Sequence, residues 1–501
     1  VGILGPGLQN AGVVVAVALV PGFVRLIRGQ ALAVREEVFV DASRALGSRA
    51  GRIVWRHLLP NVASPLIVQA SVVAGFVILF EASLSFLGLG AQPPTASWGS
   101  MLNDAYQNLL VHPWQAAPPG IAIALTVLAF NLAGDALRSA IGFTVTTHRQ
   151  DQLGLTTVNR PQDPDRAAAS SRFKDDALLV VQDLSMDVMT PNGRVRILDN
   201  ISFSISPGET VGLVGESGSG KSVTSLSIMR LLPSPPAQIT GGTILFEGKD
   251  LLSLPFKEIA GLRGSKIAMI FQDPMVALNP SMSIARQISQ VVRWHEGTSS
   301  KVARERMFES LEMVGISRTR ADSYPHEFSG GMRQRAMIAM ALVCRPKLLI
   351  ADEPTTALDV TIQAQVLELL HEMRRDLGLS ILFVTHDLGV VADICDRVMV
   401  MYAGQIVETA SAEDLFARPS HPYTEGLLRA MPQRAAPRTT LYAIPGQVPQ
   451  FSEIGGGCRL AARCQYVQER CREADVALTE AAPGHLARCA RVNELSLVTR
   501  P

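Results

Sequence analysis

The sequence has no excess of either charge, because its 46 lysines and arginines are balanced by 45 aspartates and glutamates. This balance excludes a protein that binds nucleic acid through basic charge spread over the whole chain, although charge can still be segregated locally. Aromatic residues are also scarce, at 5%, while the mean hydropathy is positive. We therefore expect part of the chain to prefer lipid. No basic stretch precedes an apolar core after Val1, so the sequence predicts no secretory signal.

Lysine and arginine are missing from residues 87–119, whereas seven arginines lie between positions 25 and 56. Three apolar stretches are long enough to span a bilayer, at 8–26, 63–86 and 120–141. The positive-inside rule then places 27–62 in the cytoplasm, 87–119 outside, and everything after the third stretch in the cytoplasm. Two other interpretations are buried core helices and an arginine-rich surface that binds anionic lipid or nucleic acid.

A glycine-rich loop follows the apolar run 210–214 and precedes a helix-forming run, 223–232. Its residues are Gly215, Glu216, Ser217, Gly218, Ser219, Gly220, Lys221 and Ser222, and Val223 opens the helix-forming run. Glycines let backbone N–H groups turn toward a phosphate, and a helix N-terminus adds partial positive charge. Lys221 supplies a charge for the β- and γ-phosphates, and Ser222 supplies a hydroxyl for Mg²⁺. The pattern predicts a nucleotide phosphate loop; the alternative is a flexible Gly/Ser loop before a helix.

Three more apolar runs end in polar residues. Gln272 follows 267–270, Asp352 and Glu353 follow 347–351, and His386 follows 380–385. In an α/β sheet such strand ends face the ligand crevice. Asp352 suits Mg²⁺ coordination, and Glu353 suits a general base that orients and deprotonates water. A glutamine or histidine after a strand is by itself usually structural, so Gln272 and His386 depend on their place after the phosphate loop.

A second helix start is predicted at Ser329, Gly330 and Gly331. Ser329 is a suitable N-cap, and the glycine N–H groups are unobstructed, which makes a second anion site. In isolation such a helix start is commonplace. Together with the phosphate loop, however, the segment 328–335 resembles the signature of ABC ATPases.

From residue 177 onward, the motifs in their order resemble an ABC transporter ATPase. The resemblance implies that Gln272 meets Mg²⁺ or the attacking water, that His386 contacts the γ-phosphate, and that Ser329–Gly331 binds the nucleotide of an opposite subunit. It also implies ATP and Mg²⁺ as cofactors and a dimer of ATPase subunits, with 357–359 as the loop passing between them. An aromatic residue that would stack on adenine is missing, because Val188 occupies the equivalent position.

The helix-like segment Val40–Gly47 resembles the cytoplasmic coupling loop of binding-protein-dependent ABC importers. Asp41 replaces the usual glutamate, so the carboxylate is kept. Residues 81–90 and 129–135 resemble the end of a dipeptide/oligopeptide permease subunit. Such subunits carry more spans than the three predicted here, so either another chain supplies the missing helices or the sequence is a fragment.

Four of the six cysteines fall in the last 45 residues, at Cys458, Cys464, Cys471 and Cys489. Disulfides are disfavoured in the cytoplasm, and no Cys-x2-Cys pair favours a zinc ribbon, so free thiols, zinc and an iron–sulfur cluster stay open. Together with residues 421–424, this tail resembles the C-terminal extension of dipeptide/oligopeptide importer ATPases. Members of that branch hold a four-iron cluster, so the resemblance favours [4Fe-4S] over zinc. Cys344 and Cys395 are expected to be core thiols.

We therefore predict a multidomain protein with an all-α membrane segment, an α/β P-loop NTPase domain and a small cysteine-rich extension. The expected segments are a partial permease at 1–145 with its coupling loop at 35–60, a linker at 146–176, an ABC ATPase at 177–435 and the extension at 436–501.

The leading hypothesis is the ATP-hydrolysing component of a di- or oligopeptide importer, fused to part of its permease in the plasma membrane. The expected partners are a second and unlike ATPase subunit, a second permease subunit, an extracytoplasmic substrate-binding protein and membrane lipid, but no nucleic acid. Nickel chelates or oligosaccharides are alternative cargoes. Hypotheses from other classes are a soluble ABC ATPase of DNA repair or translation, and a redox-sensing subunit whose chemistry lies in the cysteine tail.

Overall fold

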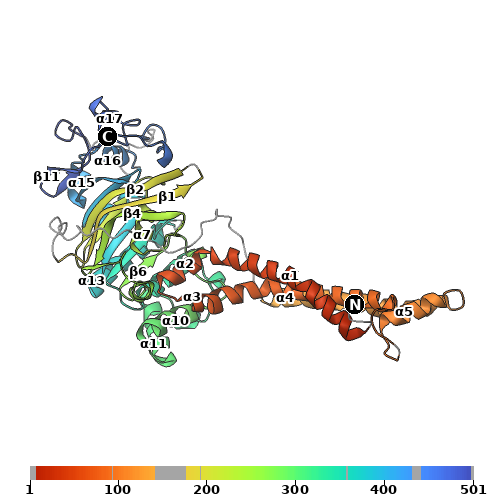
Figure 1. The fold of residues 1–501 in the computed structure, drawn as a ribbon. Helices are drawn as coiled ribbons and strands as arrows, with labels where there is room; N and C mark the ends of the chain where they lie inside the picture. Colours follow the sequence, from red (N-terminus) through yellow and green to blue (C-terminus); the bar gives the residue numbers. More distant parts are fainter. Residues whose placement is uncertain are drawn as a thin grey trace. The chain divides into compact units, whose positions relative to one another are not determined.

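The computed structural model describes residues 7–92, 94–141, 176–191, 193–356, 359–431 and 442–497. The chain forms two compact units, the first made of Val1–Val40 and Ala50–Gln150 and the second of Asp41–Arg49 and Asp151–Pro501 (Figure 1). Apart from Asp176, the linker expected at 146–176 lies outside the described residues.

The first unit is helical. Its helices, with α2 shared between the two units, are α1 (Leu8–Arg35), α2 (Val38–Ala45), α3 (Ala50–Ile53), α4 (Leu59–Phe86), α5 (Trp98–Gln107) and α6 (Ala117–Ile141). Three of these helical segments are long and apolar enough to cross a membrane, in agreement with the three stretches expected from the sequence. Large apolar side chains such as Val17 and Phe76 are exposed along them. Outward-facing apolar side chains of this kind suit contact with lipid tails.

Helix α4 packs on both α5 and α6. Gly75 allows the close approach of α4 to α6, because a Cβ there would lie 3.3 Å from a methyl carbon of Val127. Helix α5 begins in a capping box, in which the Ser97 and Ser100 side chains each accept a hydrogen bond from the other residue's backbone N–H. The polar backbone at this helix start is therefore satisfied locally.

Two sheets form the second unit, with strand orders β2-β1-β4-β5 and β11-β12-β10-β9-β3-β8-β7-β6. The strands are β1 (Leu179–Thr190), β2 (Gly193–Ile205), β3 (Thr210–Val214), β4 (Ala237–Phe246), β5 (Lys249–Asp250), β6 (Ile267–Ile270), β7 (Leu348–Asp352), β8 (Ser380–Thr385), β9 (Arg397–Tyr402), β10 (Gln405–Ser411), β11 (Thr479–Ala482) and β12 (His485–Ala487). The central strands β9, β3, β8, β7 and β6 are parallel. Strands β3, β6, β7 and β8 are buried throughout, which is why their sequences read as continuous apolar runs.

Helices connect and cover these strands. They are α7 (Lys221–Ile228), α8 (Phe256–Leu262), α9 (Pro274–Ala277), α10 (Ile284–Glu296), α11 (Ser300–Met313), α12 (Gly330–Leu342), α13 (Val360–Leu377), α14 (Leu388–Ile394), α15 (Ala412–Ala417), α16 (Pro422–Arg429) and α17 (Arg470–Glu473). The helix expected at 223–232 begins earlier and ends earlier. Arg230 adopts a left-handed φ of 49°, which is incompatible with helix continuation.

Residues 41–49 belong to this second unit. The carbonyl oxygen of Leu46 lies 2.8 Å from Nε2 of His295, on α10. Gly47 has a φ of 81°, and a Cβ at this position would lie 2.2 Å from the carbonyl oxygen of Ala260. Any larger residue would therefore displace the chain, which explains a glycine at the end of this short helical segment.

The C-terminal segment, which is the extension expected at 436–501, contains strands β11 and β12. These strands extend the eight-stranded main sheet, because β12 pairs with β10. At this junction Glu408 on β10 is fully buried. Its carboxylate accepts backbone hydrogen bonds from Ser420 and His421, and it lies 2.7 Å from Nε2 of His485 on β12. The C-terminal segment is thus joined to the main sheet by a buried polar cluster as well as by strand pairing.

We expect Glu408→Ala to lower the free energy of unfolding of the second unit by about 3–5 kcal/mol, because it leaves buried partners without their acceptor. Thermal or denaturant unfolding of the purified chain measures this loss. The exposed Glu413, on α15, provides the control. Its change to alanine should alter stability by less than about 0.5 kcal/mol. Equal stability of the two variants would contradict the assigned role of Glu408.

Candidate functional site

The phosphate loop, Gly215–Ser222, connects the buried strand β3 directly to helix α7. A Cβ at Gly215 would lie 2.2 Å from the carbonyl oxygen of Met401, so only glycine fits at the base of the loop. The carbonyl oxygen of the buried Ser219 accepts a hydrogen bond of 2.8 Å from the N–H of Gly404, in the turn between β9 and β10. The base of the loop is therefore fixed by the neighbouring strand pair.

Other residues of the loop fall into two groups. Ser217 and Gly218 are exposed at its tip, where backbone N–H groups can reach a ligand. Gly220 is buried with a φ of 108°, and Val223 packs against the hydrophobic core of the unit. The loop thus joins an open tip to a buried base at the start of α7, where the helix N-terminus favours an anion.

Lys221 is 5% exposed. Its ammonium group donates hydrogen bonds to the carbonyl oxygens of Gly215, at 2.7 Å, and Glu216, at 2.9 Å. Burial lowers the pKa of Lys221, and this effect is opposed by the carboxylates of Glu353, Asp352 and Glu216. The ammonium group is therefore held inside the loop by acceptors that phosphate oxygens can replace.

Ser222 and Asp352 bring together the two ligand types that Mg²⁺ prefers, a hydroxyl and a carboxylate. The Ser222 hydroxyl donates to Oδ1 of Asp352 at 3.1 Å, and Asp352 is 5% exposed at the end of β7. Burial raises the pKa of Asp352 to about 6, with the Ser222 hydrogen bond opposing the shift and Glu353 adding to it. A nearby cation favours the ionised carboxylate. The donor set fits a magnesium ion.

Glu353 is the centre of a second cluster. Its Oε2 accepts hydrogen bonds from the Gln272 amide at 3.0 Å and the Thr356 hydroxyl at 2.9 Å. Its Oε1 lies 3.3 Å from Nδ1 of His386, at the end of β8. Three residues expected from different strand ends, Gln272, Glu353 and His386, therefore meet at one carboxylate. This arrangement suits a base that receives a proton from water, with the histidine and the amide beside it.

The backbone at Glu353 has a φ of 47°, in the left-handed region that non-glycine residues rarely adopt. Its N–H donates to the carbonyl oxygen of Val384 at 2.8 Å, which holds the segment against β8. Thr356 was not predicted from the sequence, although a threonine three residues after a candidate base is within reach of it. Backbone strain at a site residue is a recurrent feature of catalytic centres.

Ser329 caps α12, and its hydroxyl accepts a hydrogen bond from the N–H of Met332. Ser329 and Gly330 are exposed, and Gly331 is half-buried against Ile362. The open N-terminus of α12 is therefore available at the surface. Of the loop expected at 357–359, Ala357 and Leu358 lie outside the described residues, while Asp359 caps α13.

The four tail cysteines line one small cavity, together with apolar residues such as Leu460 and Val467. Burial raises the pKa of the Cys458, Cys464 and Cys489 thiols, so each favours its neutral form. Among the described residues, however, no group of three or more His, Cys, Asp or Glu side chains is arranged to hold a metal ion. The geometry therefore does not support the metal site expected from the sequence. All six cysteines are free thiols; of the two expected core thiols, Cys395 is buried and Cys344 is half-buried.

Three family models match parts of the chain. Residues 198–356 match the model described as "ABC transporter". Residues 1–146 match "Binding-protein-dependent transport system inner membrane component", and residues 407–471 match "Oligopeptide/dipeptide transporter, C-terminal region". The matches follow the order of segments expected from the sequence.

Several curated relatives are similar to more than half of the chain. The chain is 51% identical to "Probable peptide ABC transporter ATP-binding protein y4tR" of Sinorhizobium fredii, over 65% of this chain and 98% of the relative. It is 52% identical to "Oligopeptide transport ATP-binding protein OppD" of Bacillus subtilis, over 58% of this chain and 82% of the relative. It is 49% identical to the Escherichia coli protein of the same name, over 63% of this chain and 93% of the relative.

Proposed function

The chain belongs to the ATP-binding proteins of the peptide ABC transporters, and we propose that it hydrolyses ATP to drive the import of di- or oligopeptides. Its N-terminal helices add part of a permease to the same chain, which makes it a membrane protein with a cytoplasmic ATPase. The observation that carries the proposal is the cluster at Glu353, where Gln272, Thr356 and His386 surround one carboxylate beside the phosphate loop.

In the proposed reaction the phosphate loop binds the triphosphate through its N–H groups and Lys221. Ser222, Asp352 and Gln272 would hold Mg²⁺, and a bound Mg²⁺ would neutralise charge on the phosphate oxygens. Glu353 accepts a proton from the attacking water, and His386 keeps that water and the γ-phosphate aligned. Each role uses a group that the fold places within hydrogen-bonding distance of another member of the site.

The same proposal needs a second ATPase subunit. The open N-terminus of α12, with Ser329–Gly331, would bind the nucleotide held by the partner subunit. The equivalent segment of the partner would in turn bind the nucleotide held by this chain. The other proposed partners are a second permease subunit, which supplies further helices, and an extracytoplasmic substrate-binding protein. Closure of the ATPase pair on ATP, and its opening after hydrolysis, would be transmitted through the coupling loop at 35–60. The contact between Leu46 and His295 supports this route.

Uptake of radiolabelled cargo tests the function. The full chain is reconstituted in proteoliposomes with its neighbouring subunits and the binding protein, with ATP on the ATPase side. We expect ATP-dependent accumulation of a labelled peptide and none when the chain carries Glu353→Gln. Accumulation of only nickel chelates or oligosaccharides would reject the peptide cargo. Steady hydrolysis with no transported cargo would instead favour a soluble type of ABC ATPase.

For the cysteine-lined cavity we propose a [4Fe-4S] cluster, with zinc as the alternative. It is supported by the four thiols that share the cavity, not by their present arrangement. Anaerobically purified chain should then contain about four iron and four sulfide ions. Cys464→Ser should lose them, whereas Cys395→Ala, outside the cavity, should keep them. Zinc alone, or no metal in wild-type protein, rejects the cluster.

A further inference from the structure

The segment between the first two tail cysteines contacts the phosphate loop. Arg463, immediately before Cys464, is 5% exposed at its side chain. Its guanidinium binds both carboxylate oxygens of Glu216, from Nη1 to Oε2 at 2.7 Å and from Nη2 to Oε1 at 3.1 Å. Its Nε donates to the carbonyl oxygen of Pro445 at 2.8 Å. A two-point contact of this kind fixes the direction of both side chains.

Glu216 is also held through its backbone. Its N–H donates to the hydroxyl of Tyr423 at 2.8 Å. Tyr423 is 1% exposed, and its ring packs on Tyr402 with centroids 4.7 Å apart. It directly follows His421 and Pro422, which line the cysteine cavity. Glu216 is therefore held at two points by residues that adjoin the wall of this cavity.

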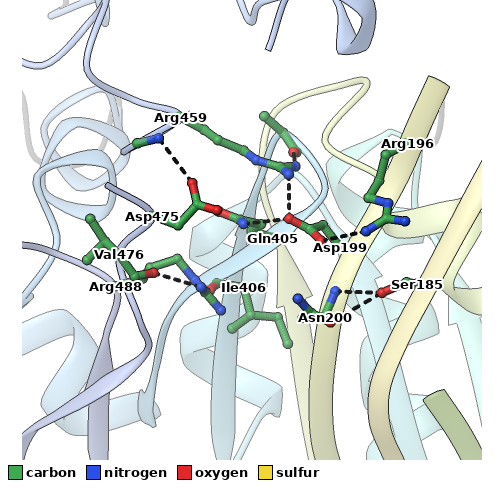
Figure 2. Close-up of polar contacts among 12 residues, drawn as sticks. Ser185, Arg196, Asp199, Asn200, Gln405, Ile406, Arg459, Asp475, Val476 and Arg488 are labelled. Carbon is green, nitrogen blue, oxygen red and sulfur yellow. Dashed lines mark hydrogen bonds and ion pairs between the residues drawn. The ribbon is translucent and has the colours of Figure 1, made fainter. Parts of the chain in front are cut away.

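A second arginine in the same segment contacts the turn behind the loop. Arg459, immediately after Cys458, donates to Oδ2 of Asp199 at 2.6 Å and to the carbonyl oxygen of Ala403. Figure 2 shows Arg459 and Gln405 converging on Asp199. Ala403 precedes Gly404, whose N–H binds the carbonyl oxygen of Ser219 in the phosphate loop. The short segment Cys458–Cys464 thus contacts the phosphate loop directly through Arg463 and indirectly through the turn at Ala403 and Gly404.

The negative charge of Glu216 lies next to the place where the phosphates of ATP are proposed to bind. Glu216 lies close enough to Lys221 to act on its pKa. An unpaired carboxylate at this position would repel the phosphates that Lys221 attracts, because like charges at short range repel each other. Arg463 supplies the compensating charge inside the protein.

We propose that Arg463 is a positioning residue for ATP. It holds and neutralises Glu216, so that the segment Cys458–Cys464 stabilises the conformation of the phosphate loop. This role adds a supporting residue to the nucleotide site and rests on the ATP-binding function proposed above. It gives the C-terminal segment a part in nucleotide binding through this chain's own side chains, whatever occupies the cavity. We also expect that a substitution in the wall of the cysteine cavity alters ATP binding by displacing Arg463.

Equilibrium titration of the full chain in detergent with ATP and Mg²⁺ tests the proposal. We expect Arg463→Ala to raise the Kd for ATP about tenfold, within the range for directly contacting pairs. Arg463→Lys, which keeps the charge but loses the two-point contact, should show a smaller increase. Adding Glu216→Gln to Arg463→Ala should restore affinity, because no unpaired carboxylate is left. An unchanged Kd in Arg463→Ala, or an increase that Glu216→Gln leaves in place, overturns the proposal.

Arg470 provides a matched control. It precedes Cys471 as Arg463 precedes Cys464, but its exposed side chain pairs with Glu494 instead of the phosphate loop. Arg470→Ala should change the Kd for ATP by less than about twofold, since exposed ion pairs contribute little. Lys221→Met distinguishes a wrong phosphate site from a wrong role for Arg463: if ATP binding stays intact in this variant, the assignment of the phosphate site is wrong. If Lys221→Met abolishes ATP binding while Arg463→Ala leaves the Kd for ATP unchanged, only the role proposed for Arg463 is wrong.

A double-mutant cycle tests whether the cysteine cavity affects ATP binding through Arg463. Cys464→Ala should raise the Kd for ATP in the otherwise wild-type chain, and the increase should disappear when Arg463 is already alanine. Such non-additivity identifies Arg463 as the carrier of the effect. Full additivity of the two changes would show that the cavity does not act through Arg463.

Discussion

Replacing Glu353 by glutamine should lower kcat for ATP hydrolysis by roughly 10²- to 10⁴-fold, the usual contribution of a general base. The amide keeps the shape of the side chain and can still accept the hydrogen bond from Thr356, but it cannot take a proton from water. The Kd for ATP should stay close to that of the wild type, because the phosphate loop is untouched. Steady-state ATPase assays of the assembled transporter, together with ATP titration, measure the two quantities separately.

Glu372→Gln is the control for this variant, because it makes the same chemical change at an exposed position of α13. It should leave kcat unchanged. A Glu353→Gln protein that hydrolyses ATP at the wild-type rate would show that the proton acceptor lies elsewhere. Loss of both hydrolysis and ATP binding would point instead to a folding defect, which thermal unfolding of the purified variant would reveal.

The second large effect is expected at Lys221. Lys221→Met fills a similar volume but removes the only side-chain cation within the Gly215–Ser222 loop. Hydrogen bonds to charged groups contribute about 1.5–3 kcal/mol each, so losing the ammonium contacts to phosphate should raise the Kd for ATP by about two orders of magnitude. Hydrolysis should fall with binding. ATP titration and ATPase assays over a range of ATP concentrations test both effects.

Lys221→Arg is the informative companion, because it keeps the charge and changes only the shape of the group. Only 5% of Lys221 is exposed, so the larger planar guanidinium should not fit and binding should still be weakened. Normal ATP affinity in Lys221→Met would remove Lys221 from the phosphate site. A normal unfolding temperature in both variants would confirm that the loss of binding is local.

Sequence reasoning identified the side chains that sit at strand ends. Gln272, Asp352, Glu353 and His386 each follow a buried run, and parallel strands bring such ends to the same edge of a sheet. The meeting of Gln272 and His386 at Glu353 was therefore predictable without coordinates. The sequence also indicated three apolar helices, because length and hydropathy alone decide whether a helix can cross a bilayer.

The contacts made by the tail were not predictable in the same way. Arg463 and Glu216 are separated by 247 positions, and no period or motif relates them. An arginine beside a cysteine reads as a solvated residue until the fold is known. The pair Glu408 and His485 was missed for the same reason, since a glutamate within a strand carries no signal of its partner in the sequence. Thr356 was missed because a single hydroxyl near a carboxylate is common.

Strand β10 would be an edge strand of the main sheet without β12 and β11. A chain cut after residue 435 would expose its unpaired N–H and C=O groups beside apolar side chains such as Ile406 and Val407. Exposed edges of this kind recruit strands from other molecules and lead to aggregation. The C-terminal segment therefore also protects the sheet against intermolecular pairing, and an isolated ATPase unit prepared for crystallisation should retain it.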